Sequence, residues 1–238
     1  MGDYLKIMAE LTRRDPANAD WQLHLSFAHR KAGDLYITKR DLNQALQQHK
    51  ASLAIRERLL AAAPENPLYL HEVGVSLSSV GLVELNSGDA AAAIKSFRSA
   101  HELLVKAAKS NPRRFDWVHD DGISLSQRGD AYRSLGDLSE ALVSYREALA
   151  VMEGLSKVEP QNWRWPYIAS QLESKISDVL QALGRHEDAL AAGRRGLALL
   201  QRLAQISPDN PGIKRWLQRL EERVRILSRI ERNKNRAG

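Results

Sequence analysis

Five prolines stand at a fixed interval of 48 residues along this chain, at Pro16, Pro64, Pro112, Pro160 and Pro208. A spacing kept over a whole sequence indicates a repeat architecture, in which one supersecondary unit is copied and stacked. Other positions recur with the same period. These columns hold asparagine (Asn18, Asn66, Asn162, Asn210), aromatic residues (Trp21, Tyr69, Trp117, Trp165), glycine (Gly88, Gly136, Gly184) and alanine (Ala45, Ala93, Ala141, Ala189).

Each unit is predicted to contain two helices of about 20 residues, each about 30 Å long. In the third unit, apolar residues recur at steps of three and four, which is typical of one buried helix face. Gly136 and Asp137 separate this helix from the one before it. Glycine tolerates the left-handed conformation that ends a helix, and aspartate caps the start of the next. The predicted buried face consists of Leu138, Ala141, Leu142, Tyr145, Ala148, Leu149, Met152 and Leu155.

The period divides the chain into four full units within one solenoid domain, at residues 16–63, 64–111, 112–159 and 160–207. Residues 1–15 are expected to form a partial repeat with an N-terminal helix. Residues 208–232 are expected to form a capping helix, and residues 233–238 a basic tail. Because a single helix pair cannot bury its apolar face alone, neighbouring units must stack on one another.

Composition and charge narrow the class of protein. The chain has no cysteine, which excludes disulfides, thiolate metal sites and cysteine nucleophiles, and no apolar stretch approaches the roughly 20 residues of a membrane helix. The N-terminus lacks a signal-peptide pattern, so we expect a cytoplasmic protein. The net charge is +6, but 12 basic and only 4 acidic residues lie between Arg194 and Gly238, leaving 23 basic and 25 acidic residues before them. The basic character belongs to the C-terminal end.

The third unit resembles the tetratricopeptide repeat, whose pattern contains a Gly-x2-Tyr step followed by Ala-x3-Phe within 34 residues. Here the matching residues are Gly129 and Tyr132, then Gly136, then Ala141 and Tyr145, then Ala148. A 48-residue unit then has about two turns added to each helix, and similar long units resemble repeat arrays of bacterial signalling and defence proteins. The resemblance implies an all-α, right-handed superhelical solenoid of antiparallel helix pairs.

The resemblance also implies that the first helix of each pair lines a concave groove for an extended peptide or a partner helix. Asp34, Asp130 and Asp178 share one column of this groove, which favours a basic or mixed-charge partner; alternatively, these carboxylates only solvate a helix face. Carried over by column, the candidate groove residues are Phe27, Arg30, Asp34, Ile37, Val75, Ser78, Leu82, Leu85, Ile123, Ser126, Asp130, Arg133, Gln171, Ser174, Asp178 and Gln181.

The sequence indicates no catalytic, metal or cofactor site. Three His-Glu pairs occur, but the second histidine that a zinc-protease helix requires four residues later is replaced by Val75, Val105 or Leu190. We therefore expect His71, His101 and His186 to be solvated. No glycine-rich phosphate loop is present. The chain is predicted not to be an enzyme and to bind no cofactor.

The predicted C-terminal helix carries many arginines beside its apolar face. A polar outer face is what a capping helix needs, but the same arginines would also suit nucleic acid or another anionic surface. The first interpretation of the whole chain is a non-catalytic protein–protein interaction scaffold, as an adaptor or as the recognition arm of a larger signalling or defence assembly. The alternative is binding of an anionic partner through Arg215, Arg219, Arg223, Arg225, Arg229 and Arg232.

Overall fold

The computed structural model describes the backbone of residues 2–237 and the side chains of residues 3–232. Side chains of the predicted basic tail, 233–238, lie outside the described residues. Throughout residues 2–237 the secondary structure is helical, with short connections and no strand, so the expected all-α fold is confirmed. No helix in this described part is both long and apolar enough to cross a membrane. The chain forms two compact units, Met1–Ala131 and Tyr132–Gly238.

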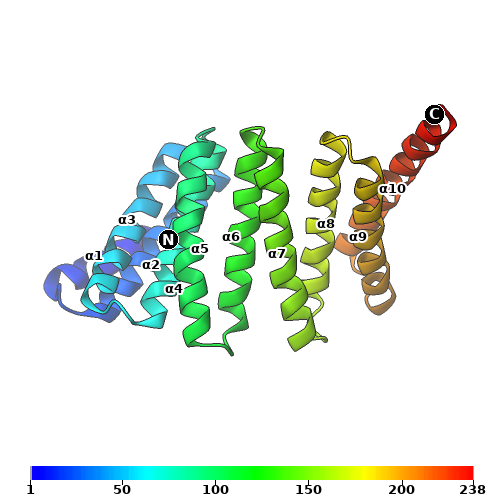
Figure 1. Ribbon diagram of the computed structural model, residues 1–238. Coiled ribbons are helices and arrows are strands. Elements are labelled where there is room, and N and C mark those ends of the chain that lie inside the picture. The colour runs from blue at the N-terminus through cyan, green and yellow to red at the C-terminus, as the bar shows by residue number, and fades with distance from the viewer. Residues whose placement is uncertain (1, 238) are drawn as a thin grey trace. The chain divides into compact units, whose positions relative to one another are not determined.

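Unit 1 is built from an N-terminal helix and two helix pairs, followed by most of α6 (Figure 1). Each helix packs against the next, from α1 on α2 through to α4 on α5. The connections are short, so successive helices run antiparallel. The helices are α1 (Gly2–Arg14), α2 (Ala19–Thr38), α3 (Leu42–Ala62), α4 (Pro67–Asn86), α5 (Ala90–Ser110) and α6 (Phe115–Ser134).

Unit 2 begins in the last turn of α6 and continues through four helices, each packed on the next from α7 to α10. They are α7 (Leu138–Val158), α8 (Arg164–Ala182), α9 (His186–Ile206) and α10 (Pro211–Ala237). The last helix runs to Ala237, beyond residue 232, where the sequence suggested the capping helix would end. Helices α2 to α9 have 19 to 21 residues, close to the predicted length.

Helix starts follow one column of the repeat. The side chains of Asp41, Asp89 and Asp137 each accept a hydrogen bond from the backbone N–H three residues later, at 3.0, 2.9 and 3.1 Å. Just before Asp137, Gly136 has a φ of +80°, the left-handed conformation that closes the preceding helix. In the first unit Arg40 takes this conformation with a φ of 61°, which a residue with a Cβ adopts less readily.

Small residues allow the helices of a pair to approach closely. All four alanines of the column Ala45, Ala93, Ala141 and Ala189 are completely buried, each with 0% exposure. At Gly33, an added Cβ would lie 2.6 Å from Nε2 of His49, which is too close for real contacts. The large side chains of the second helices therefore fill space that the small residues of the first helices leave open.

Gly74 offers a test of this close packing. A Cβ added there would lie 2.7 Å from Cγ of Leu104 and 3.2 Å from the backbone oxygen of Ala100, so Gly74→Ala should lower the free energy of unfolding by about 1–3 kcal/mol. Gly154 is also within a helix, but nothing lies within 4 Å of a Cβ added there, so Gly154→Ala should raise stability by about 0.5–1 kcal/mol. Urea unfolding measures both changes. Equal effects of the two substitutions would contradict this account of the packing.

Candidate ligand groove

A buried arginine joins three helices of unit 1. The guanidinium of Arg56 on α3 is 1% exposed, and its Nη2 lies 2.7 Å from Oε2 of Glu72 on α4. Its Nη1 also donates to the backbone oxygen of Glu72 and to Oγ of Ser76, and its Nε donates to Oγ of Ser26 on α2, all at 2.9 Å. Burial lowers the pKa of Arg56 to about 10, although Glu72 acts in the opposite direction. The guanidinium thus stays charged at neutral pH and fixes the carboxylate of Glu72.

A second charged pair joins α4 to α6. His71 Nε2 lies 2.9 Å from Oδ2 of Asp120, and the His71 ring stacks on Trp117 with centroids 4.8 Å apart. The other ring nitrogen, Nδ1, lies 3.7 Å from Oε1 of Glu72. Burial lowers the pKa of His71, but the neighbouring carboxylates of Asp120 and Glu72 outweigh it, so that the pKa is raised overall. The imidazolium form is therefore favoured between these two carboxylates.

Asp120 also receives a hydrogen bond from its neighbour on α6. Nδ1 of His119 lies 3.3 Å from Oδ1 of Asp120, while His71 contacts the other carboxylate oxygen. Burial would raise the pKa of Asp120, but the hydrogen bonds from His119 and His71 lower it to about 2. The side chain is still 37% exposed, so an ionised carboxylate reaches solvent at this point.

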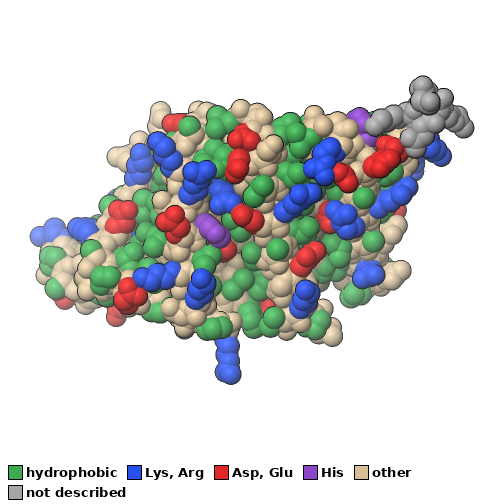
Figure 2. Space-filling model, in the orientation of Figure 1, with side chains coloured by type: hydrophobic (Ala, Val, Ile, Leu, Met, Phe, Trp, Pro, Cys, Tyr) green, Lys and Arg blue, Asp and Glu red, His purple; other side chains and the backbone are tan. Residues whose placement is uncertain are grey.

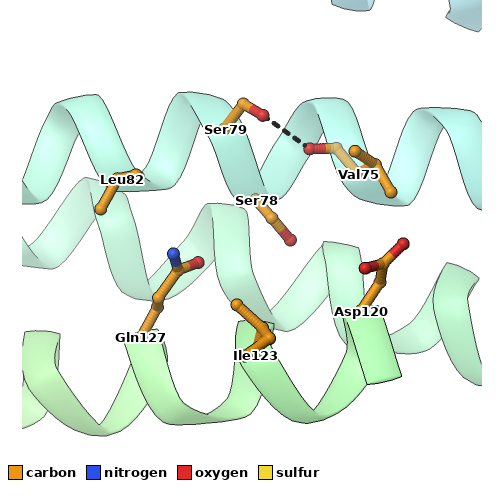
Figure 3. Close-up of a pocket in the computed structure, with 7 residues that line it drawn as sticks. All are labelled: Val75, Ser78, Ser79, Leu82, Asp120, Ile123 and Gln127. Carbon is orange, nitrogen blue, oxygen red and sulfur yellow. Dashed lines mark hydrogen bonds between the residues drawn. The ribbon is translucent and has the colours of Figure 1, made fainter. Parts of the chain in front are cut away.

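That carboxylate lines a pocket of about 160 Å³ between α4 and α6, which we call the α4–α6 pocket. Figure 3 shows side chains of both helices directed into the space between them, while the hydroxyl of Ser79 turns back to the carbonyl oxygen of Val75, at 3.0 Å. Ser78 Oγ donates to Oγ of Ser124 on α6, at 3.1 Å. The lining residues are Val75, Ser78, Ser79, Leu82, Asp120, Ile123 and Gln127.

Four of the candidate groove residues therefore meet in this pocket, since Val75, Ser78, Leu82 and Ile123 all line it. The first three lie on α4 and Ile123 lies on α6, which are the first helices of two neighbouring repeat units. Ser126, also on α6, is 9% exposed and does not line the pocket. Asp130, one turn further along α6, is half-buried.

The candidates on α2 form a separate charged group. Arg30 Nη1 lies 3.6 Å from Oδ2 of Asp34, and Nε2 of the buried His49 lies 3.7 Å from Oδ1 of the same carboxylate. Burial lowers the pKa of His49 despite the attraction of Asp34. The ring of Phe27 lies under two guanidinium groups, with centroid distances of 5.8 Å to Arg30 and 4.9 Å to Arg56.

Unit 2 has its own pocket of about 310 Å³ between α8 and α10. It brings together groove candidates on α8 with arginines on α10, and Asp178 forms an ion pair with Arg223. Burial lowers the pKa of Arg223. The lining residues are Ser174, Asp178, Trp216, Arg219, Leu220 and Arg223. Gln171 and Gln181, on the same helix as Asp178, are half-buried outside it, and Arg133 in the last turn of α6 is exposed.

The other α10 arginines lie at the surface, and Arg219 is exposed as well although it lines the pocket. Arg215, Arg225, Arg229 and Arg232 are exposed, and Arg225 also pairs with Glu222 at 2.5 Å. Figure 2 shows basic and acidic side chains interspersed among apolar ones over the face in view.

The prediction that all three histidines of the His-Glu pairs are solvated is wrong for His71. His71 is 7% exposed and held by Asp120 and Trp117. His101 is 34% exposed but has Nδ1 only 2.6 Å from Oδ1 of Asp121. The reason is that the facing helix in each case presents a carboxylate, which compensates the burial of an imidazole.

Sequence reasoning also missed Arg56 and Asp120, although a signal was present. Arg56 occupies a column that otherwise holds Leu104, Met152 and Leu200, and a charge in a core column indicates a buried partner. Asp120 follows Glu72 by one period, so two acidic residues recur in one column of the first helices.

Replacing Asp120 should change how His71 titrates. In Asp120→Asn the neighbouring negative charge is lost, so the pKa of His71 should fall, as measured from its ring proton by NMR. The stability that the raised pKa of His71 supplies is present below its unfolded pKa of about 6.5 and is lost as the pH rises through the folded value. This pH dependence should weaken in Asp120→Asn, and an unchanged His71 titration would contradict the pairing.

Comparison with known proteins identifies the kind of repeat. Residues 123–157 match the family model described as tetratricopeptide repeat, whereas no curated protein matches the chain. The chain is similar to the structure of BtubC from P. vanneervenii, with 14% identity and a TM-score of 0.64 over 98% of this chain and 89% of that one.

Two Rap structures are also similar. Apo RapI has 13% identity and a TM-score of 0.62 over 84% of this chain and 63% of that one. The Rap conjugation gene regulator of plasmid pLS20, in complex with the Phr* peptide, has 14% identity and a TM-score of 0.52 over 90% of this chain and 58% of that one. This chain thus spans less than two thirds of either Rap chain, and at such identities the likeness concerns the fold. The resemblance seen in the sequence is confirmed: residues 123–157 match the tetratricopeptide repeat, and the chain has a tetratricopeptide-like solenoid fold of helix pairs.

Proposed function

We propose that the chain is a non-catalytic protein-interaction scaffold that binds a peptide or a partner helix along its first helices, with the α4–α6 pocket as a contact point. The observation that carries this proposal is the convergence of Val75, Ser78, Leu82 and Ile123 in one pocket. Apolar walls with a few polar groups are typical of sites that hold side chains of a ligand. The peptide bound in the Rap regulator of pLS20 is further support for a peptide ligand.

A basic or mixed-charge partner fits this proposal better than an acidic one. The column of Asp34, Asp130 and Asp178 places carboxylates along the first helices, and Asp120 adds one in the pocket. Asp34 and Asp178 have arginine partners within the chain, Arg30 and Arg223. Asp120 is contacted by the imidazoles of His71 and His119, so it is the carboxylate on which the partner's charge should act most. A role in a larger signalling or defence assembly also belongs to this proposal.

Removing the apolar walls tests the α4–α6 pocket as a contact point for the ligand. Peptides selected from a random display library against the intact chain should bind the double variant Leu82→Ala, Ile123→Ala about tenfold more weakly, because less apolar area is buried in the complex. The matched control is Val143→Ala, Val158→Ala, in which both valines are 45% and 60% exposed on α7. Circular dichroism checks that both variants keep their helices. Selected peptides that bind both variants as tightly as the parent chain would refute the pocket as a contact point.

The second candidate function is binding of nucleic acid or another anionic surface through α10, favoured by the exposure of Arg215, Arg219 and Arg229. If these arginines contact phosphates, replacing all three with glutamine should make the slope of log affinity against log salt shallower by about 3 for a short DNA duplex. Arg13→Gln with Arg14→Gln is the control, because both arginines pair with Glu10 on α1. Absence of duplex binding at about 50 mM salt would eliminate this function.

A further inference from the structure

The α4–α6 pocket has a single charged lining residue. Its apolar walls are Val75, Leu82 and Ile123, its neutral polar groups are two serines and a glutamine, and Asp120 stands at one end. On α6, Asp120 and Ile123 are three residues apart, which places them about 4.5 Å apart along the helix axis. A ligand that fills this pocket therefore meets an apolar wall and a carboxylate within the reach of one or two adjacent side chains.

Asp120 is not reserved for the ligand, because His71 holds one of its oxygens. If His71 were neutral with its proton on Nε2, its Nδ1 lone pair would face Oε1 of Glu72 at 3.7 Å, which is unfavourable. As an imidazolium, His71 can face both carboxylates. The geometry alone thus couples the proton on His71 to the charge that Asp120 presents to the pocket.

The other charges around His71 are largely paired. From α3, Arg56 neutralises Glu72. Before α6, Arg114 pairs with Asp116 at 2.7 Å and lies over the Trp117 ring, on which His71 also stacks. Among the described residues, the charged and titratable groups around His71 come from every helix packed against it. They include Arg30 from α2, Arg56 from α3, Glu72 on α4, His101 on α5 with its partner Asp121, and Arg114, Asp116, His119 and Asp120 from α6 and the residue before it.

We infer that the α4–α6 pocket takes a cationic side chain of the partner, arginine or lysine, on Asp120, beside an apolar side chain held by Val75, Leu82 and Ile123, and that His71 competes with this cation for Asp120. The inference rests on the proposed function, since it names the partner chemistry at the same pocket. It makes Asp120 a specificity-determining residue and His71 a positioning residue that acts through it.

The competition between His71 and the ligand determines the direction in which affinity changes with pH. At low pH the proton on His71 cancels the charge of Asp120, whose own pKa of about 2 keeps it ionised throughout the physiological range. As the pH rises through the raised pKa of His71, the imidazolium is lost and Asp120 becomes free to pair with the ligand. Affinity for a cationic ligand should therefore increase with pH, and the bound cation should in turn lower the pKa of His71, because linkage is reciprocal.

Three short peptides test the inference on the unaltered chain. Each is acetylated, amidated and glycine-flanked, with a central leucine followed by arginine, by the neutral isostere citrulline, or by glutamate. Binding is followed from the NMR shifts of the Ile123 methyl group and the Asp120 amide. The arginine peptide should bind about two- to fivefold more tightly than the citrulline peptide at pH 8, the range of a partly exposed ion pair. This preference should shrink at pH 6, and the glutamate peptide should bind most weakly.

Two variants assign the effect to its residues. Asp120→Asn should bind arginine and citrulline peptides equally and keep the citrulline affinity of the parent chain. His71→Gln cannot titrate but can still donate a hydrogen bond, so its affinity for the arginine peptide should change less between pH 6 and pH 8 than that of the parent chain, in which both His71 and His119 contact Asp120. The control is Glu65→Gln, which removes an exposed carboxylate that pairs with Lys106 outside the pocket and should keep the preference and its pH dependence.

The outcomes separate this inference from the proposed function. If all three peptides bind with equal affinity at the pocket, the cation subsite is refuted while the scaffold function stands. If none of them shifts the pocket resonances at millimolar concentration, and library-selected peptides also ignore the pocket, the proposed function fails as well. A preference for arginine that stays the same while the NMR titration of His71 passes from imidazolium to imidazole would refute the role of His71.

Discussion

Close approach of the two helices in each pair is the constraint on which the rest of the structure depends. Four alanines 48 residues apart are completely buried, and Gly33, Gly74 and Gly81 lie so close to side chains of the facing helix that a methyl group would not fit without movement. Positions with this role cannot vary freely, so they recur in every unit or are replaced by another small residue, as by Ser177 in the glycine column. Positions that face outward are released from this constraint, and there the units differ.

This division explains how much the sequence could predict. The period and the helix caps depend on local rules, so Asp137 and Gly136 were correctly assigned from residue type alone. The pairing of His71 with Asp120 spans 49 residues, one more than the period, and so joins neighbouring columns on successive first helices. Periodicity indicates that such columns are adjacent, but the side-chain conformation decides whether a histidine meets a carboxylate or solvent. His71 was therefore predicted as solvated although it is buried.

The same limit applies to the aspartate column. The sequence places Asp34 and Asp178 on equivalent turns, but their partners differ. Asp34 is paired with Arg30, four residues earlier on its own helix, and with the imidazole of His49. Asp178 is paired with Arg223, which comes from α10. Residues of one column therefore occupy equivalent positions in the fold but have different electrostatic environments. The carboxylate in the α4–α6 pocket is Asp120, which does not belong to the aspartate column.

Stability alone does not account for the charged layer beside that pocket. The column of Arg56 is filled elsewhere by Leu104, Met152 and Leu200, each completely buried. Replacing a buried ion pair with well-packed apolar residues is often neutral or stabilising, so a leucine would serve the core at least as well as Arg56 does. What leucine could not do is hold the carboxylate of Glu72 against Nδ1 of His71. Without that carboxylate the imidazolium would lose one of its two neighbours, and the proton that controls the charge of Asp120 would be held less firmly. The presence of arginine instead of an apolar residue at position 56 is thus best explained by the α4–α6 pocket. Through Glu72 and His71, Arg56 influences the charge that Asp120 presents there.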